Sequence, residues 1–293
     1  MVNYNPKEWF SLIFKFHQSD TFQILWPAML SIGIFAGLIA YAEIELLQLR
    51  FKSSTVLHSL LGFVISLMLV FRTNTAYERW SEGRRLWGSL VNSSRNLLIQ
   101  LKAFLPQGST MDIHHIALLV GNFAFVLKNH LRSSPNTQEL EEDTSFKTQQ
   151  IEGEAHWPNY ITYRLYKKLN DFFQDGLLTD AQLLILNTEL KQFIDICGAC
   201  ERIKKTPIPF SYSLFLKKFM FAYIMTMPFG FVFDFGYWII LIVVFVFYVL
   251  ASLELIAEEI EQPFGTDAND LPLEDLSQTI RRNIKAIAAY PND

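Results

Sequence analysis

The stretch from Phe235 to Leu253 holds 19 residues without a charged side chain. As an α-helix it is about 28 Å long, which nearly matches the roughly 30 Å of hydrocarbon in a bilayer. Inside lipid, backbone polar groups are satisfied only in helices or closed barrels, and an apolar run of this length is typical of a helix. The stretch therefore predicts a membrane-spanning helix and restricts the fold to those that a bilayer permits.

Three further stretches predict the rest of a membrane domain. Between Asp20 and Glu43 lie 22 uncharged residues, enough for a first span. Val56–Phe71 is a second span of 16 uncharged residues, and Tyr212–Phe233 is a third with two lysines near one end. Because the second span is short for a helix surrounded by lipid, it suits a place enclosed by protein or lining a cavity.

The composition indicates membrane spans combined with a sizeable aqueous part. Hydrophobic residues make up 51% of the 293-residue chain, and the net charge of -4 is too small to indicate a nucleic-acid partner. Residues 76–209 contain no apolar run that we judge long enough to span. We expect an interfacial helix at 1–20, two spans within 21–75, a helical cytosolic domain at 76–209, two further spans within 210–253 and a cytosolic C-terminal segment at 254–293.

The distribution of basic residues sets the expected orientation. Four arginines follow the second span closely, at positions 72, 79, 84 and 85, whereas the loop before it carries Arg50 and Lys52. Since basic residues concentrate on the cytoplasmic side, we expect this end of the span, and both termini, to be cytoplasmic.

The second span carries an apolar ridge. Phe63, Leu67 and Phe71 are spaced by four residues and therefore share one face of a helix. Gly62, Ser66 and Val70 form a neighbouring face of smaller residues, which allows another helix to approach closely. The pattern leaves two interpretations open: an ordinary buried helix, or a ridge that faces the axis of an oligomer and forms an apolar constriction.

Polar features outside the spans receive mostly structural interpretations. Thr179 and Gln182 fit a capping box at a helix start, and Asp270 is placed to cap a final helix. The acidic segment 133–158 is poor in apolar residues and predicts a surface loop. Arg72 and Glu78 leave two interpretations open, a functional role or pairing of each with another helix, and we favour the structural one.

No set of residues predicts catalysis or a cofactor, so we expect no enzyme. The chain has no Walker loop, no G-x-S-x-G and no H-E-x-x-H. Cys197 and Cys200 are interpreted as buried small side chains, and the neighbouring His114 and His115 as surface residues. Four glutamates after the fourth span, at positions 254, 258, 259 and 261, are expected to form a solvated face rather than a metal site.

Short blocks in a fixed order carry a resemblance to a known family. They are spread over more than two-thirds of the chain: Phe71–Asn74, Ala76–Arg79, Leu86–Gly88, Cys200–Arg202, Thr206–Tyr212, Ala257–Glu261, Pro263–Gly265 and Asn269–Leu273. In these residues the chain resembles the bestrophins, in particular their bacterial members.

The resemblance implies an all-α homopentameric channel with four transmembrane helices per subunit. The second span, 56–71, would line a central pore that continues into a helical cytosolic vestibule. By the same resemblance, Phe63, Leu67 and Phe71 form an apolar pore neck, and Ala181, just after Asp180, lies at a cytosolic aperture. The implied partners are further copies of the chain, membrane lipid and monovalent ions, in the inner membrane of a bacterium.

Two departures from the family pattern limit what is carried over. Ala181 stands where close bacterial relatives have a larger apolar residue, so a tight aperture is in doubt. The segment Thr266–Asp270 has two aspartates where animal members have a longer acidic run. Because Ca²⁺ takes six to eight oxygen ligands, we expect no calcium site.

The expected function is conduction of monovalent ions, with cations such as Na⁺ favoured because bacterial members resemble cation channels. The alternatives are a chloride or other anion channel, as the animal members resemble, and a non-conducting membrane-anchored interaction protein. A reversal potential under a NaCl gradient separates the two kinds of channel, and absence of flux identifies the interaction protein.

Overall fold

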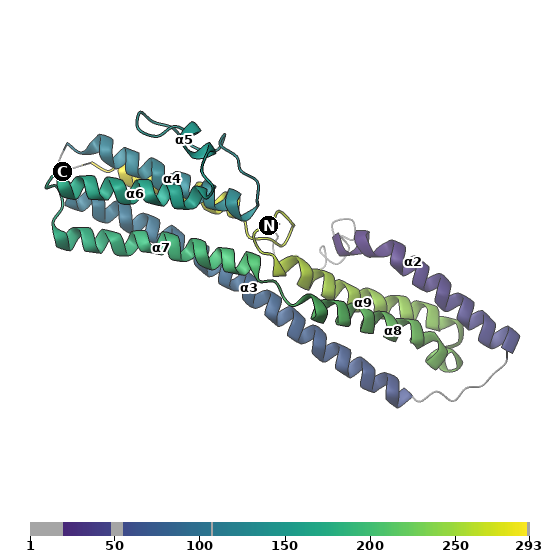
Figure 1. The fold of residues 1–293 in the computed structure, drawn as a ribbon. Coiled ribbons are helices and arrows are strands. Elements are labelled where there is room, and N and C mark those ends of the chain that lie inside the picture. Colours follow the sequence, from purple (N-terminus) through teal and green to yellow (C-terminus); the bar gives the residue numbers. More distant parts are fainter. Residues whose placement is uncertain (1–19, 48–54, 107, 292–293) are drawn as a thin grey trace. The chain divides into compact units, whose positions relative to one another are not determined.

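The computed structural model describes residues 20–47, 55–106 and 108–291, and the regular structure in these ranges is entirely helical (Figure 1). The interfacial helix expected within 1–20, and the loop residues Arg50 and Lys52, lie outside the described residues. In chain order the elements are α2 (Asp20–Tyr41), η2 (Ala42–Leu47), α3 (Thr55–Phe104), α4 (Thr110–Leu131), α5 (Gln149–Glu152), α6 (Trp157–Gln174), α7 (Asp180–Lys205), α8 (Phe210–Phe235), η3 (Gly236–Trp238), α9 (Ile239–Glu261) and α10 (Leu273–Ala288). The all-α prediction is confirmed.

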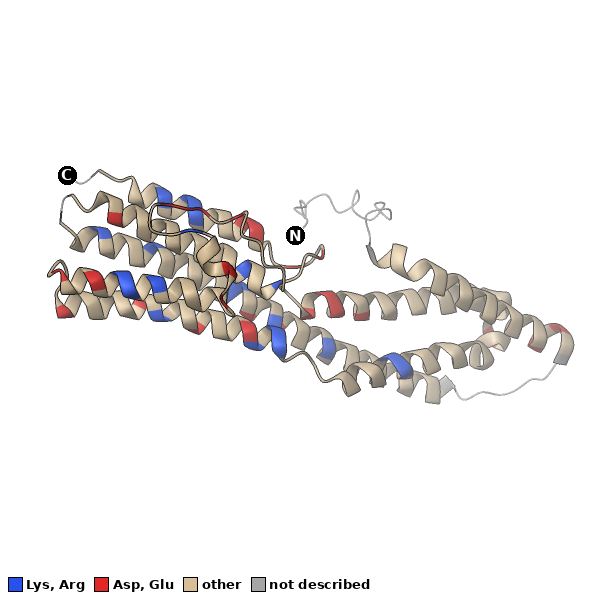
Figure 2. Cartoon of the chain, turned by 45° about the horizontal axis from the view of Figure 1, so that its top comes forward, with Lys and Arg blue, Asp and Glu red and all other residues tan. Residues whose placement is uncertain are grey.

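These helices form two compact units. The span unit comprises the described residues up to Arg79 together with Pro207–Gln262, and so contains α2, α8, α9 and the first part of α3. The bundle unit comprises Trp80–Thr206 and the described residues from Pro263 onward. Charged residues are dense on the helices of the bundle unit, whereas α2, α8 and α9 have long uncharged stretches (Figure 2).

In the span unit, small and branched side chains are buried between α2, α8 and α9. Ala36 and Ala40 of α2 are fully buried against residues such as Ile239 and Val243 of α9. Large apolar side chains point outward instead, for example Leu38 at 63% and Phe245 at 66% exposure. An apolar exterior of this extent is typical of a surface that meets lipid or another subunit.

Four stretches are long and apolar enough to cross a membrane: Thr21–Leu46, Val56–Phe104, Thr110–Leu131 and Phe210–Glu261. The last contains both α8 and α9, so the four spans predicted from the sequence all lie within three of these stretches. The described chain is therefore a helical multi-pass membrane protein by length and composition.

The third stretch, α4, lies within the helical domain expected at 76–209, but the statement that these residues contain no apolar run of spanning length is wrong. The reason is that α4 is the central helix of the bundle unit. In its apolar window 67% of the residues are buried, against 11–17% in the other three stretches. A helix enclosed by α6, α7 and α10 is apolar on all sides for the same reason as a helix in lipid.

Close packing fixes α4 within the bundle unit. A Cβ added to Gly121 would lie 3.3 Å from Ile284 Cδ1, so the missing side chain lets α10 approach. The Lys128 ammonium is buried as well, and it pairs with Glu139 at 2.8 Å and Glu274 at 2.5 Å. Phe123 of α4 packs edge-on against Phe193 of α7.

The segment between α4 and α6 is mostly irregular, as expected, but it is more than a surface loop. Leu140, Phe146 and Ile151 are buried in the main core of the bundle unit. The Asn122 side chain fixes the segment to α4, since it donates to the Glu141 carbonyl and accepts from the Glu141 N–H.

The two helix-cap predictions have opposite outcomes. The capping box at the start of α7 is present: the Thr179 hydroxyl accepts from the Gln182 N–H, and the Gln182 side chain accepts from the Thr179 N–H. Asp270 does not cap α10, whose N-cap is Pro272. The buried Asp270 carboxylate instead accepts from the Asp267 N–H at 2.7 Å and so closes the preceding turn.

Helix α3 runs without interruption through residues expected to form two separate helices. The second span and the helical pattern from Ala76 onward are one helix of 50 residues. Neither proline nor glycine occurs between Phe63 and Glu82. No residue in this part of α3 therefore breaks the backbone hydrogen-bond ladder.

Candidate functional site

The apolar ridge on α3 points away from the rest of the span unit. Phe63, Leu67 and Phe71 are 65%, 47% and 60% exposed. The opposite side of the helix is buried, with Ile65 and Leu69 packed against α8. Within one chain the ridge is thus an uncovered surface, which excludes the interpretation of α3 as an ordinary helix buried in its own subunit.

Close helix packing on another side holds the ridge in place. A Cβ added to Gly62 would lie 2.8 Å from the Tyr223 hydroxyl of α8, so the missing side chain lets Tyr223 approach α3 closely. The Tyr212 hydroxyl donates to the Met68 carbonyl at 2.9 Å. Gly62 of the predicted small face therefore receives α8, whereas Ser66 and Val70 are exposed.

The ridge continues along α3 as a polar line. At about 100° per residue, these side chains lie within the same 80° sector as the ridge. They are exposed and carry amide, hydroxyl and charged groups: Asn74, Glu78, Arg85, Ser89, Asn92 and Asn96. One face of α3 thus changes from apolar to polar directly after Phe71.

A buried ion-pair cluster follows the ridge immediately. Arg72 is 2% exposed, and its Nη1 lies 2.6 Å from Glu261 Oε2, while its Nε lies 3.5 Å from Glu254 Oε2. Glu261 Oε1 also accepts from the Ile208 N–H at 2.6 Å, and Arg79 donates to the Glu261 carbonyl. The cluster fixes α3 beside Phe71 to the end of α9.

This cluster confirms one prediction and corrects another. Arg72 pairs across helices, with Glu254 and Glu261 of α9, as its structural interpretation expected. Glu254 and Glu261 are buried rather than solvated, because residues seven apart share one helix face and both point at Arg72. Glu258 alone fits the original description, since it is exposed and pairs with Lys217 at 2.8 Å.

The expected aperture residues lie in the bundle unit, at the start of α7. Asp180 and Ala181 are exposed in its first turn, directly after the Thr179 cap. The exposed surface continues with Leu184 at 68% and Ile185 at 47%. Their position at a helix end is compatible with an aperture, but also with a carboxylate that only complements the helix dipole.

The cysteine prediction is confirmed, and the histidine prediction is half right. Cys197 and Cys200 are free and buried, and burial raises the pKa of the Cys197 thiol to about 12. His114 is exposed. The His115 side chain is only 11% exposed and pairs with Asp143 at 2.5 Å.

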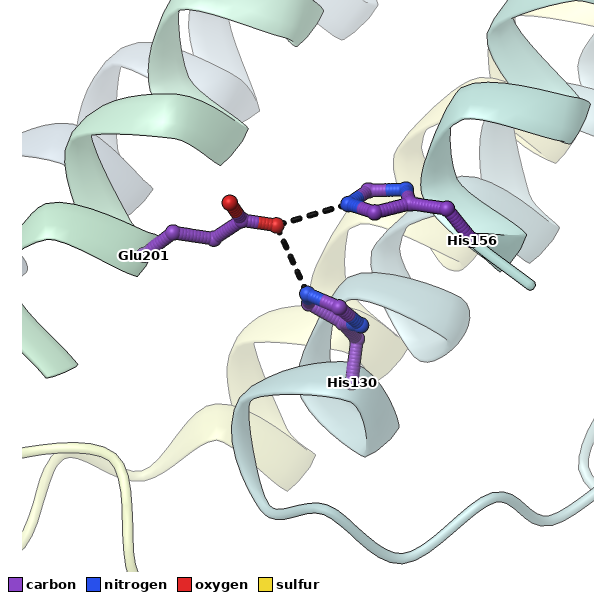
Figure 3. Close-up of side chains that lie close together, drawn as sticks. All are labelled: His130, His156 and Glu201. Atoms are coloured by element: carbon purple, nitrogen blue, oxygen red, sulfur yellow. Dashed lines mark hydrogen bonds and ion pairs between the residues drawn. The ribbon is translucent and has the colours of Figure 1, made fainter. Parts of the chain in front are cut away.

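A cluster that the sequence did not predict joins three elements of the bundle unit. His130 near the end of α4 and His156 at the N-cap of α6 both point at Glu201 of α7 (Figure 3). Each imidazole Nε2 lies 2.7 Å from Glu201 Oε1. The three residues are separated by 26 and 45 positions and form no known motif, so only the folded structure brings them together.

The helices define a helical multi-pass membrane protein by their length and composition, and comparison with known proteins gives its family. A family model described as Bacterial/Fungal Bestrophin protein matches residues 1–286. The chain belongs to the bestrophin family. A crystal structure of a bacterial bestrophin homologue from Klebsiella pneumoniae matches with a TM-score of 0.84 and 29% identity, covering 91% of this chain and 99% of that one.

Curated relatives have a common functional name. A voltage-dependent anion channel-forming protein of Nostoc sp. is 36% identical, over 98% of this chain and 94% of the relative. The protein of the same name, YneE, from Escherichia coli K12 is 32% identical, over 96% of this chain and 91% of the relative. These are channel-forming proteins and not enzymes, and they are bacterial.

The names of these relatives overturn one expectation. The sequence led us to favour cations such as Na⁺, by analogy with bacterial bestrophins. Since full-length relatives at 36% and 32% identity are named for anion channels, the cation preference is wrong. The physical reason for the error is that the ridge itself carries no charge and therefore contains no information on the sign of the permeant ion.

Proposed function

We propose that the protein is a homopentameric anion channel of the bacterial inner membrane. The observation that carries the proposal is the uncovered apolar ridge of Phe63, Leu67 and Phe71, in a chain whose relatives are named as anion channel-forming proteins. Five copies of the ridge would form three apolar rings over about 12 Å of pore. Such a neck offers no polar replacement for the water around an ion and can close by dewetting.

The polar line on α3 supports anion passage beyond the neck. Amide and hydroxyl groups donate hydrogen bonds to anions. Arg85 lies on this line and Arg84 and Arg95 lie beside it, all exposed, against Glu78 on the line and Glu82 beside it, which pairs with Arg202. Repeated around an axis, these arginines would raise the local concentration of anions.

The remaining parts of the proposal follow the family pattern. Asp180 and Ala181 would surround a cytosolic aperture, and both termini would be cytoplasmic. Conduction would not need Ca²⁺, because Thr266–Asp270 offers two aspartates towards the six to eight oxygen ligands that this ion takes.

Two measurements on purified protein test the proposal. Mass determination in detergent should give five chains per particle. In planar bilayers under a KCl gradient, the reversal potential should lie near the equilibrium potential of Cl⁻. A reversal potential near that of K⁺ would contradict the anion channel, and a monomer or dimer without flux would instead identify a non-conducting interaction protein.

The neck is tested by Phe63→Ala with Phe245→Ala as its matched control. Both residues are phenylalanines of the span unit with nearly equal exposure, 65% and 66%, but Phe245 is on α9. Phe63→Ala should raise conductance or open probability, whereas Phe245→Ala should leave both unchanged. Equal currents from wild type and Phe63→Ala would remove the neck from this ridge.

A further inference from the structure

The cluster of His130, His156 and Glu201 in the bundle unit has a geometry that the channel mechanism does not use. One ligand atom from each residue, Nε2 of each histidine and an oxygen of Glu201, lies within 4.8 Å of the other two. The three side chains come from three different elements and converge on one point (Figure 3). Convergence of two imidazoles and one carboxylate is the ligand pattern of many zinc sites.

The donor atoms of the cluster select the class of metal. Two nitrogen donors with one oxygen donor select transition metals over Ca²⁺ and Mg²⁺, which take oxygen ligands.

A cavity gives access to the cluster. It has a volume of about 440 Å³ and is lined by His130 and Glu201, together with two acidic residues, Glu152 and Glu154. A metal held by three protein ligands would keep a position open to water on this side.

Lysines next to the cluster oppose a cation, but neither blocks it. Lys204 already donates to the His130 carbonyl and to the Ser133 hydroxyl. Lys205 Nζ lies 3.4 Å from Glu201 Oε2, and its side chain is 70% exposed, so it can turn into solvent. The oxygen that faces the histidines is Oε1, which Lys205 does not contact.

His156 has a second role that the metal would change. Its Nδ1 accepts from the Asn159 N–H at 3.2 Å and so caps α6. A neutral imidazole bound to metal through Nε2 carries its proton on Nδ1 and cannot accept this bond. The cluster therefore has two forms: a metal-free form with the cap of α6 intact, and a metal-bound form in which the cap is released.

We propose that His130, His156 and Glu201 form a transition-metal site that suits Zn²⁺. The site links the end of α4, the start of α6 and the last turns of α7. The site is independent of the ridge on α3, so its failure would leave the proposed channel untouched. Its expected effect is to stabilise the bundle unit and to change the exposure of the first turn of α6.

The test uses tag-free, full-length protein in detergent and Zn²⁺ alone, measured by isothermal titration calorimetry. Wild type should bind one Zn²⁺ per chain, and Glu201→Gln and His156→Asn should each weaken binding at least tenfold. Asparagine is a good N-cap residue, so His156→Asn removes the ligand nitrogen and keeps the cap of α6. His114→Gln is the matched control, because His114 is exposed and contacts only the Thr110 carbonyl.

Zinc bound with equal affinity by wild type and both cluster variants would overturn the site, as would no binding by wild type at 100 µM. If the variants do not fold, X-ray absorption at the zinc edge of the loaded wild type decides. Scattering from two imidazoles would support the site, and a spectrum without imidazole would overturn it. If the three residues form only a hydrogen-bonded cluster, wild type will bind no zinc there, and this result also overturns the site.

Discussion

Helix α3 passes through both units, and its two parts place the same kinds of side chain in opposite environments. In the span unit it exposes Phe63 and Phe71 at 65% and 60%. In the bundle unit it buries Trp87, Leu90 and Leu98 completely. In the bundle unit the chain's own core removes apolar side chains from water, whereas in the span unit this chain leaves the ridge uncovered.

The two units also differ in how they surround their buried charged side chains. The span unit buries the charges of Arg72, Glu254 and Glu261 together, and the bundle unit buries Lys128 between carboxylates that stay partly exposed. Desolvation is costly in both cases, so removing one partner leaves an uncompensated charge. The comparison therefore predicts which substitutions harm which unit.

The largest effect is expected from Arg72→Ala, which leaves Glu254 and Glu261 buried without their cation. We expect a loss of about 3–5 kcal/mol in the free energy of unfolding of the span unit. The comparison variant is Lys217→Ala, which breaks a pair whose side chains are 46% and 52% exposed and should cost about 0–1 kcal/mol. Thermal unfolding in detergent measures both, and similar losses would contradict the burial argument.

The same substitution at two positions of α3 separates the two environments. Leu98→Ala removes a fully buried side chain and should destabilise the bundle unit by about 2–5 kcal/mol. Leu67→Ala, at 47% exposure on the ridge, should change stability by less than about 1 kcal/mol while it raises conductance. A large loss of stability with unchanged currents in Leu67→Ala would show that this leucine is a core residue.

The third effect depends on pH and concerns Glu201. Its folded-state pKa of about 2 lies below the ordinary 4.5, so the stabilisation is complete above about pH 4.5 and is lost as the pH falls towards 2. The total is of the order of 2–3 kcal/mol for a side chain that is 19% exposed. Glu201→Gln should lack this acid dependence of the melting temperature. Parallel melting curves of wild type and variant across this range would be the contrary result.

The smallest effect is expected at the start of α7. Asp180→Asn removes five negative charges from the proposed aperture, and anion conductance should rise in dilute salt, where the Debye length is longest. At 1 M salt the difference should disappear. Asp195→Asn removes the same charge from an exposed position further along α7 and should have no effect. If Asp180→Asn also has none, Asp180 serves only as a helix-start residue.

Much of the fold could be predicted from the sequence, because long runs without charged residues form helices that are shielded from water. The spans around Phe235–Leu253 and before Glu43, and the cap at Thr179, depend on residues close together in the chain. The spanning length of the apolar run in α4 was missed, and such a run does not say whether protein or lipid surrounds it. The partners of Arg72, and the meeting of His130 with Glu201, depend on tertiary contacts across 189 and 71 positions, which no local pattern contains.

The candidate site was predictable to a different degree. Spacing placed Phe63, Leu67 and Phe71 on one face, and the structure shows that this face is uncovered. The sign of the permeant ion was not predictable, because the ridge is neutral and the charges beside it, such as Arg85 and Glu78, have both signs. That question was decided by relatives and not by residues.

The pairing of Arg72 with Glu261 has a consequence for the order in which the protein is made. The two residues are separated by 189 positions. At roughly 5–20 residues per second, the ribosome completes Glu261 roughly 10–40 s after Arg72. During that interval the second span carries a cation at its end whose partners do not exist yet, so α3 cannot settle into its final place until α9 has been inserted. The second membrane span therefore reaches its final position only after the last one, in α9, has been synthesised.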